Sequence, residues 1–309
     1  MGILQRVDKQ MLYTDGIRNF FLRLKEEETV RWIDDIYSSL PELISKWGIT
    51  CLAPNQIARY GLVIEASTLE HGDIILKFTP EFINRFEREA ESYAILPKSY
   101  MCELIDTDYQ HRCMILRKIP KVGYACFEDE PKLEAFYKNV VEDAVRYTGQ
   151  DLKYIGPYKP ELKKRCDDSS ELVFCDREIK EELAFAWELY GETFDNSPLY
   201  ILHGDLIDLN VLDDGERYYG VDPIGFLAPI ELECARFIRN DTRNHPEEGY
   251  ENRFNRLVRF FERFFDRDRL IKMFVIDMAY CTYNSVFEND TPDETLVDLE
   301  LIRIARQQL

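Results

Sequence analysis

The chain has 309 residues, and its 58 Asp and Glu against 39 Lys and Arg give a formal net charge of −19 at pH 7. This charge argues against DNA or RNA as a partner, because nucleic-acid binding requires a basic surface, and it favours cationic partners. The hydrophobic share of 45% is too high for a disordered acidic chain. No signal-peptide pattern is present, and no apolar run reaches the roughly 18 residues needed to span a bilayer. We therefore expect a cytoplasmic protein without membrane contact, and nothing in the sequence indicates its oligomeric state.

The first third of the chain is predicted to be rich in strands. A helix with apolar residues at helical spacing from Val30 is expected to end at Gly48. The turn His71-Gly72-Asp73 is expected to join strands in a hairpin, and Thr79 with Pro80 is typical of a helix start. The expected strands cover 57–68, 74–78, 101–105 and 113–119, and the helix after Thr79 is expected to reach about residue 96.

After Pro120 the pattern becomes mainly helical. Helices are predicted near 131–147 and 177–190, the second closed by Gly191, and again from about 230 to the end, with Thr291 opening the last one. A β-rich island at 199–222 interrupts them and is expected to form a hairpin. The predicted fold class is α+β, with a small β-rich lobe (1–118) that holds one key helix and a larger mainly helical lobe (119–309). The boundary is expected near 117–121.

The β-rich island carries the residues with the clearest chemistry. Asp205 is followed five residues later by Asn210, and Asp222 stands twelve residues further on, next to Pro223. Phosphoryl transfer requires a carboxylate that orients the attacking hydroxyl and oxygen ligands for Mg²⁺. We therefore predict that Asp205 is the catalytic base, that Asn210 and Asp222 hold Mg²⁺, and that His203 braces the loop. The alternative is that these are ordinary turn residues between strands.

Three segments carry a family resemblance. Residues 203–212, 221–225 and 231–240 resemble the aminoglycoside phosphotransferase family, and they look most similar to its branch of streptomycin 6-kinases and hydroxyurea phosphotransferases. The resemblance implies a protein-kinase-like bilobal fold, ATP as donor with GTP as the alternative, and Mg²⁺ as cofactor. Ile207 and Leu209 stand where the branch usually has His and Gly, and Ile224 stands where it usually has Lys.

A kinase-like interpretation requires a Lys in a strand of the first lobe and a helical Glu to hold it. Lys77 lies in an otherwise apolar strand, where a charge is costly unless it meets a phosphate or a carboxylate. In the following helix, Glu89 falls closest to the apolar stripe, whereas Glu87 and Glu91 point further outward. We therefore predict a Lys77–Glu89 pair. The alternative is that Lys77 snorkels at an edge strand and Glu89 is solvated.

Two further nucleotide contacts follow from the resemblance. The hairpin that covers the phosphates lacks a glycine-rich motif and offers Gly61, with the small residues Ala66 and Ser67 as substitutes. The connector at 114–119 occupies the place of the hinge that accepts adenine. Leu116 and Lys118 are its predicted cofactor-binding residues.

The expected acceptor is a small hydroxylated molecule, with a cationic one favoured by the acidic charge. Its predicted contacts are Glu231, Glu233, Asp241 and Glu288, although acidic residues near helix ends also serve to stabilise the helix dipole. The leading hypothesis is an aminoglycoside such as streptomycin as acceptor of the γ-phosphate. The alternatives are a kinase of similar fold with a sugar, amino sugar or choline-like acceptor, and a nucleotide-binding sensor without turnover.

Overall fold

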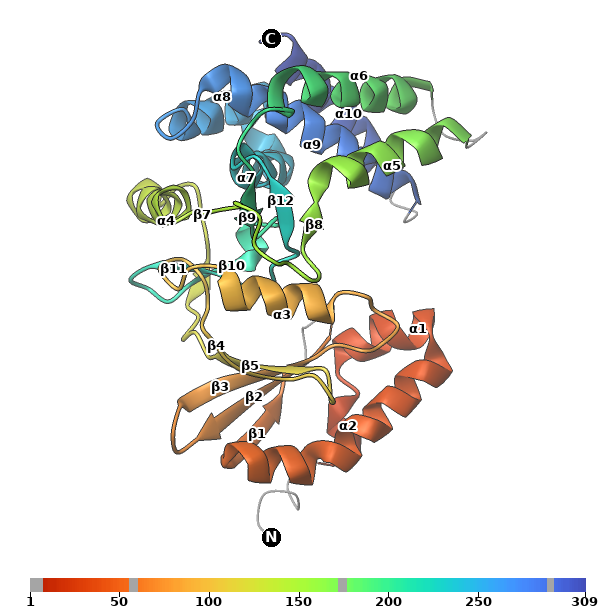
Figure 1. The fold of residues 1–309 in the computed structure, drawn as a ribbon, viewed down its shortest axis with the longest axis vertical. Helices are drawn as coiled ribbons and strands as arrows, with labels where there is room; N and C mark the ends of the chain where they lie inside the picture. Colours follow the sequence, from red (N-terminus) through yellow and green to blue (C-terminus); the bar gives the residue numbers. More distant parts are fainter. Residues whose placement is uncertain (1–7, 56–60, 172–176, 288–291) are drawn as a thin grey trace. The chain divides into compact units, whose positions relative to one another are not determined.

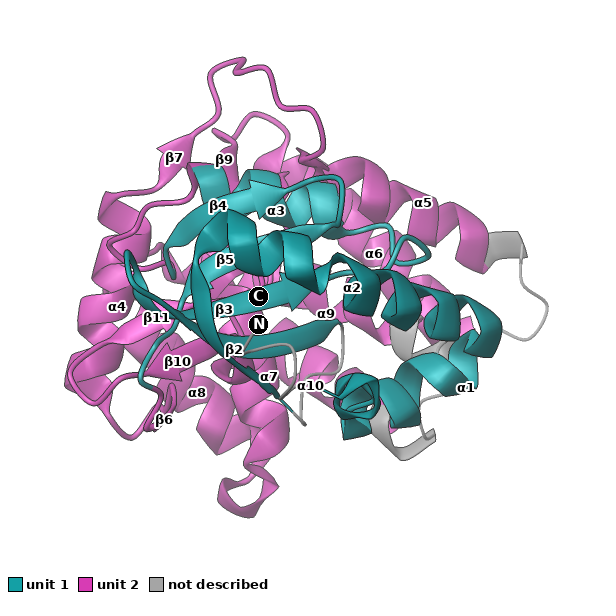
Figure 2. Ribbon diagram, turned by 90° about the horizontal axis from the view of Figure 1, so that it is seen from below, with its two compact units in different colours: residues 1–94, 102–120 teal, residues 95–101, 121–309 magenta. Residues whose placement is uncertain are grey.

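The computed structural model describes residues 8–55, 61–171, 177–287 and 292–309. It divides into two compact units, coloured separately in Figure 2. Unit 1 comprises residues up to 94 together with 102–120, and unit 2 comprises residues 95–101 together with 121–309. The assignment of residues 95–101 to unit 2 was not indicated by the sequence.

Unit 1 consists of an N-terminal helical segment, an antiparallel sheet and one further helix (Figure 1). The helical elements are η2 (Lys9–Leu12), η3 (Ile17–Phe21), α1 (Leu22–Leu24), α2 (Glu26–Trp47) and α3 (Phe86–Ile95). The strands are β1 (Ile49–Pro54), β2 (Leu62–Thr68), β3 (Gly72–Phe78), β4 (Leu104–Asp108) and β5 (Cys113–Arg117). They pair in the order β1-β2-β3-β5-β4.

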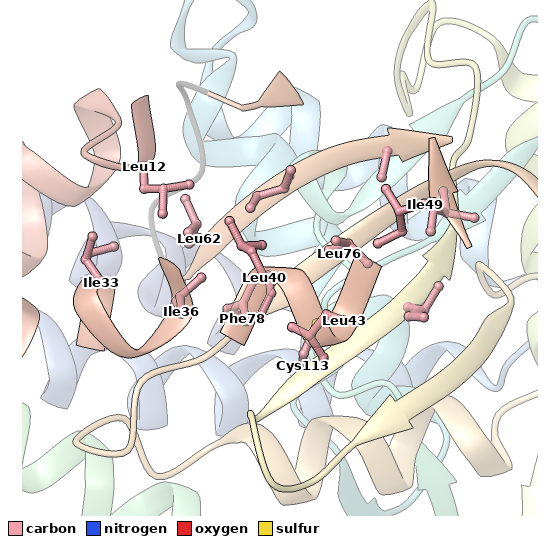
Figure 3. Close-up of a cluster of buried hydrophobic side chains, with 14 of the residues drawn as sticks. Leu12, Ile33, Ile36, Leu40, Leu43, Ile49, Leu62, Leu76, Phe78 and Cys113 are labelled. Atoms are coloured by element: carbon pink, nitrogen blue, oxygen red, sulfur yellow. The ribbon is translucent and has the colours of Figure 1, made fainter. Parts of the chain in front are cut away.

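The core of unit 1 lies between α2 and one face of this sheet. Side chains alternate between the two faces of a sheet along each strand. Leu62 of β2 and Leu76 of β3 lie on the face that packs against the apolar stripe of α2, which includes Ile36 and Leu40 (Figure 3). The predicted end of α2 is confirmed at Gly48, whose φ of +61° is readily adopted by glycine.

In unit 1, the predicted start of one helix was wrong and one strand was missed. The helix after Thr79 begins only at Phe86, because the backbone of Thr79 exchanges hydrogen bonds with Arg112 in the β4–β5 turn, so Thr79 does not cap a helix. Strand β1 was not predicted at all. It lies at the edge of the sheet and contains Pro54, which an edge strand tolerates.

Unit 2 combines helices with two small sheets. The helices are α4 (Glu130–Glu142), α5 (Tyr158–Glu171), α6 (Arg177–Phe194), η4 (Asp208–Asn210), α7 (Glu231–Asn244), η5 (Pro246–Glu248), α8 (Tyr250–Phe261), α9 (Arg267–Phe287) and α10 (Pro292–Arg306). The strands are β6 (Gly123–Tyr124), β7 (Val145–Arg146), β8 (Gly156–Pro157), β9 (Tyr200–Leu202), β10 (Val211–Asp213), β11 (Tyr218–Gly220) and β12 (Phe226–Ala228). They form sheets of order β11-β10-β6 and β7-β9-β12-β8.

The single hairpin expected in this part of the chain is therefore two sheets, because β6, β7 and β8 join the island from distant positions. Gly191 does not close α6, which continues to Phe194, and α4 ends before the expected residue 147. Thr291 lies outside the described residues. No described helix has the length and apolar character that crossing a membrane would require.

Candidate active site

In unit 1, Lys77 and Glu89 form a buried ion pair. The Lys77 Nζ lies 2.5 Å from Glu89 Oε1, and the two residues are 3% and 1% exposed. Arg85 Nε lies 3.5 Å from the other Glu89 oxygen, and Glu87 pairs instead with Arg112. The predicted Lys77–Glu89 contact, which was inferred from the helical period, is therefore confirmed.

Strand alternation explains why Lys77 meets α3. Its neighbours Leu76 and Phe78 point into the core beneath α2, so the side chain of Lys77 points to the opposite face of the sheet, where α3 carries Glu89. The pairing with one carboxylate fixes the position of this buried ammonium group. Such a group can bind an anion such as a nucleotide phosphate.

The residues expected in a phosphate-covering turn lie elsewhere. Ala66 and Ser67 are inside β2 and pair with both β1 and β3. Between β1 and β2, residues 56–60 lie outside the described residues. Gly61 is required there by close packing, because a Cβ would lie 2.5 Å from the Phe78 carbonyl oxygen.

The two expected hinge residues are both engaged within unit 1. Leu116 is a buried residue of β5 and lies between β3 and β4. Lys118 donates its backbone N–H to Asp73 and places its ammonium 2.6 Å from Glu65. Nucleotide contacts by these two residues stay predictions.

In unit 2, the loop after β9 is held from within. His203 is fully buried, its Nδ1 accepts the backbone N–H of Asp205 (3.2 Å), and its Nε2 lies 2.8 Å from the Val221 carbonyl. This arrangement fits the neutral imidazole with its proton on Nε2. Both ring nitrogens are thus used in fixing the loop, which agrees with the bracing role expected for His203.

Asp205 and Asn210 are joined within this loop, and Asp222 follows a residue that is bonded to it. The Asn210 side-chain amide donates to both the carbonyl and the carboxylate Oδ2 of Asp205 (2.9 Å each), and the Asn210 carbonyl accepts the backbone N–H of Val221. This last bond places Asp222 next to the loop. Asp222 has a φ of +61°, an uncommon conformation for a residue other than glycine and typical of sites where geometry is imposed by function.

Helix α7 supports the loop with two charges that the sequence did not indicate as supports. Both oxygens of Glu233 accept backbone N–H groups, from His203 (2.5 Å) and Gly204 (3.1 Å). Arg236 donates to the Gly204 carbonyl and lies 3.6 Å from Asp205 Oδ1, and Asp277 of α9 holds its Nε. In principle, the rule that buried charges require partners could have pointed to these two residues of α7.

The carboxyl group of Glu233 has a perturbed acidity. Complete burial raises its pKa to about 7, against the opposing effect of the hydrogen bonds from Gly204 and His203. The group is therefore an integral part of the loop support. An acceptor contact by Glu233 stays a prediction, and the structure shows its carboxyl group engaged with the loop.

The other expected acceptor contacts do not present open carboxylates either. Glu231 lies 2.6 Å from Arg269, and Asp241 lies 2.5 Å from the fully buried Arg253. Burial raises the pKa of Asp241 although the hydrogen bond from Arg253 opposes this. Glu288 lies outside the described residues.

The chain was compared with known proteins. No protein-family model matches it, and no curated protein matches it by sequence. Solved structures do match. A ternary complex of a thermostable mutant of aminoglycoside phosphotransferase APH(4)-Ia with ADP and hygromycin B has a TM-score of 0.60 at 13% identity, over 87% of this chain and 98% of that one.

Two further matches are a choline kinase and a choline/ethanolamine kinase family protein. Choline kinase LicA from Streptococcus pneumoniae has a TM-score of 0.61 at 11% identity, over 89% of this chain and 100% of its own. A choline/ethanolamine kinase family protein from Mesorhizobium loti has a TM-score of 0.58 at 18% identity, over 88% of this chain and 93% of its own. The chain therefore adopts the α+β, protein-kinase-like bilobal fold that the sequence resemblance implied.

Proposed function

We propose that this protein is an ATP- and Mg²⁺-dependent phosphotransferase that transfers the γ-phosphoryl group to a hydroxyl of a small molecule. The observation that carries the proposal is that one kinase-like fold holds both a buried Lys77–Glu89 pair and a loop in which Asp205 and Asn210 are joined beside Asp222. Each of these features has a separate role in phosphoryl transfer.

The roles follow from the chemistry of each group. Lys77, held by Glu89, binds the α- and β-phosphates as a fixed cation. Asp205 accepts the proton of the attacking hydroxyl, and the amide of Asn210 and the positive charge of Arg236 orient its carboxylate. His203 acts through the loop and does not touch the reactants.

The donor set fits Mg²⁺. The NH₂ group of Asn210 is turned to Asp205, so its amide oxygen is the atom that remains for a metal, and Asp222 supplies a carboxylate. Magnesium favours a few protein oxygens together with water and phosphate. When bound, it neutralises the charge of the transferred phosphate.

The acceptor we propose first is the one implied by the family resemblance, an aminoglycoside of the streptomycin type. The ternary complex of the aminoglycoside phosphotransferase with hygromycin B supports this proposal. A metabolic acceptor such as a sugar, an amino sugar or a choline-like alcohol is the second candidate, supported by the two choline-kinase matches. Within this second candidate, the pairing of Glu231 and Asp241 with arginines favours a neutral sugar, because these carboxylates are then not available to ammonium groups.

The test is phosphoryl transfer from ATP to a panel of aminoglycosides, sugars, hydroxyurea and choline, detected by mass spectrometry. Asp205→Asn should reduce transfer by about 10²-fold or more, in the range of a lost general base, while Asp214→Asn, in the β10–β11 turn, should not. Wild-type rates in Asp205→Asn would refute the assigned base. Nucleotide binding without transfer to any acceptor would support the non-catalytic sensor instead.

A further inference from the structure

Unit 1 contains a cavity of about 610 Å³, which is bounded by α2, by the segment after β3 and by the turn between β4 and β5. This volume is within the range of about 300–1,000 Å³ that is usual for small-molecule sites. The described residues that line the cavity do not include Lys77 or Glu89. The cavity is therefore a different site from the one proposed for the nucleotide phosphates.

The wall that follows β3 contains a buried hydroxyl group without a partner. Thr79 lines the cavity and is fully buried, and its Oγ1 has no hydrogen-bond partner among the residues that the structure describes. A buried hydroxyl is unfavourable unless it is bonded. Arg112 fixes this wall, because it donates to the carbonyl oxygens of Thr79 and Ile83 (3.2 Å each) and pairs with Glu87 of α3. A polar ligand atom can supply the missing bond to the hydroxyl.

Two aromatic rings form another part of the lining. Trp32 of α2 and Phe82 are both partly exposed. Each of them contacts the ring of the buried Phe21, with centroids 5.6 Å and 5.9 Å apart. The core thus supports two rings whose remaining surface lies in the cavity, and such surfaces favour the apolar body of a ligand.

Arg31 and Asp35 bring opposite charges to the same cavity. They lie four residues apart on α2, so they share one side of the helix, and both are exposed. This spacing permits an ion pair, yet the two side chains do not form one, and neither has an ion pair or a side-chain hydrogen bond elsewhere in the described chain. A ligand with a single charge would lie near a like charge, whereas a zwitterion matches both.

We infer that this cavity binds a zwitterionic amino acid with a hydroxylated aromatic ring, of which tyrosine is the simplest example. Arg31 binds its carboxylate and Asp35 binds its ammonium group. The ring packs against Trp32 and Phe82, and the ring hydroxyl bonds to the hydroxyl of Thr79. This binding site lies outside the proposed phosphotransferase site, and the inference does not depend on that function.

The experiment titrates the full chain with L-tyrosine and three analogues that each lack one group. Tyramine lacks the carboxylate, 3-(4-hydroxyphenyl)propionate lacks the ammonium group, and L-phenylalanine lacks the ring hydroxyl. Calorimetry gives the Kd of each compound. A Trp47→Phe/Trp187→Phe background leaves Trp32 as the only tryptophan, so its fluorescence, excited where tyrosine does not absorb, reports binding at the cavity.

We expect L-tyrosine to change the fluorescence of Trp32 and to bind at least about threefold more tightly than each analogue, as one exposed ion pair or one hydrogen bond allows. Arg31→Gln should remove the preference over tyramine, Asp35→Asn the preference over the propionate, and Thr79→Val the preference over L-phenylalanine. The control Glu42→Gln, which is exposed on α2 outside the cavity, should retain all three preferences.

Three results would overturn the inference. The first is no detectable binding of L-tyrosine at about 1 mM, the weak end of specific affinities. The second is binding that leaves the fluorescence of Trp32 unchanged, because the ligand would then lie elsewhere. The third is that an analogue binds as tightly as L-tyrosine or that a preference survives in its matched variant. Arg31 and Asp35 are exposed and Thr79→Val nearly conserves volume, so these variants are expected to fold.

Discussion

The Lys77–Glu89 pair gives a prediction whose size follows from its burial. With the two residues only 3% and 1% exposed, replacing Glu89 by Gln leaves the Lys77 ammonium without its carboxylate. Removing one partner of a buried pair costs about 3–5 kcal/mol. The amide oxygen of Gln can still accept one hydrogen bond, so we expect a loss near the lower end, about 3 kcal/mol of the free energy of unfolding of unit 1.

The assay is urea unfolding followed by tryptophan fluorescence. The chain has three tryptophans, of which Trp32 and Trp47 lie in unit 1 and Trp187 lies in unit 2. A Trp187→Phe background therefore makes the signal specific to unit 1. With a denaturant slope of about 1–3 kcal/mol per M, the midpoint should fall by about 1–3 M.

Two further variants make the reasoning refutable. Glu91→Gln, on the same helix but partly exposed, should cost less than about 1 kcal/mol. The double variant Lys77→Met/Glu89→Leu should recover much of the loss, because it removes both buried charges together. If Glu89→Gln destabilises unit 1 no more than Glu91→Gln does, the pair is not the buried, charge-compensated contact described here.

Three other perturbations test unit 2: two concern the support of the loop after β9, and one concerns the buried pair of Arg253 with Asp241. Because the pKa of Glu233 is raised from 4.5 to about 7 in the folded protein, the unfolded chain loses this proton first as pH rises. The stability that Glu233 contributes is complete below pH 4.5 and is lost as pH passes 7, by about 3 kcal/mol. Urea titrations at pH 4.5 and 8 should show this loss in wild type and not in Glu233→Gln. Equal losses in the two proteins would contradict the prediction. Gly204→Ala should lower the free energy of unfolding by about 2 kcal/mol or more, because φ is +77° and a Cβ would lie 2.7 Å from the Phe226 ring. In Gly220→Ala the added Cβ would meet a flexible thioether at 2.8 Å, so the loss should be smaller. Thermal melts of both variants measure the difference. Arg253→Met should destabilise unit 2 by about 3–5 kcal/mol, since it leaves a buried carboxylate unpaired, and a melting temperature equal to that of wild type would exclude this.

The sequence was informative wherever partners are close along the chain or fixed by a period. The spacing of Asp205, Asn210 and Asp222 indicated one loop, and the structure joins Asn210 to Asp205 and to Val221, the residue before Asp222. The helical period selected Glu89 from three acidic residues of α3, and strand alternation directed Lys77 toward it. These relations depend on local geometry, which the residue types and their spacing determine.

The sequence was misleading where distant packing outweighs local preference. Thr79 and Pro80 form a strong local helix signal, yet the backbone of Thr79 is held by Arg112, 33 residues away. Strand β1 has little pattern of its own, and it is a strand because β2 offers an open edge to pair with.

The same division holds for the site. From its residue types, the sequence determined a loop suited to phosphoryl transfer, a buried cation to accompany it, and the excess of acidic residues. The tertiary structure alone decided which of those acidic residues are available. Glu231 finds Arg269 at a separation of 38 residues, and Glu233 finds the backbone N–H of His203 at a separation of 30. The net charge depends only on how many carboxylates the chain contains. A carboxylate that is bound to an arginine or to a backbone N–H is not available to a ligand, and only the folded chain brings those partners together.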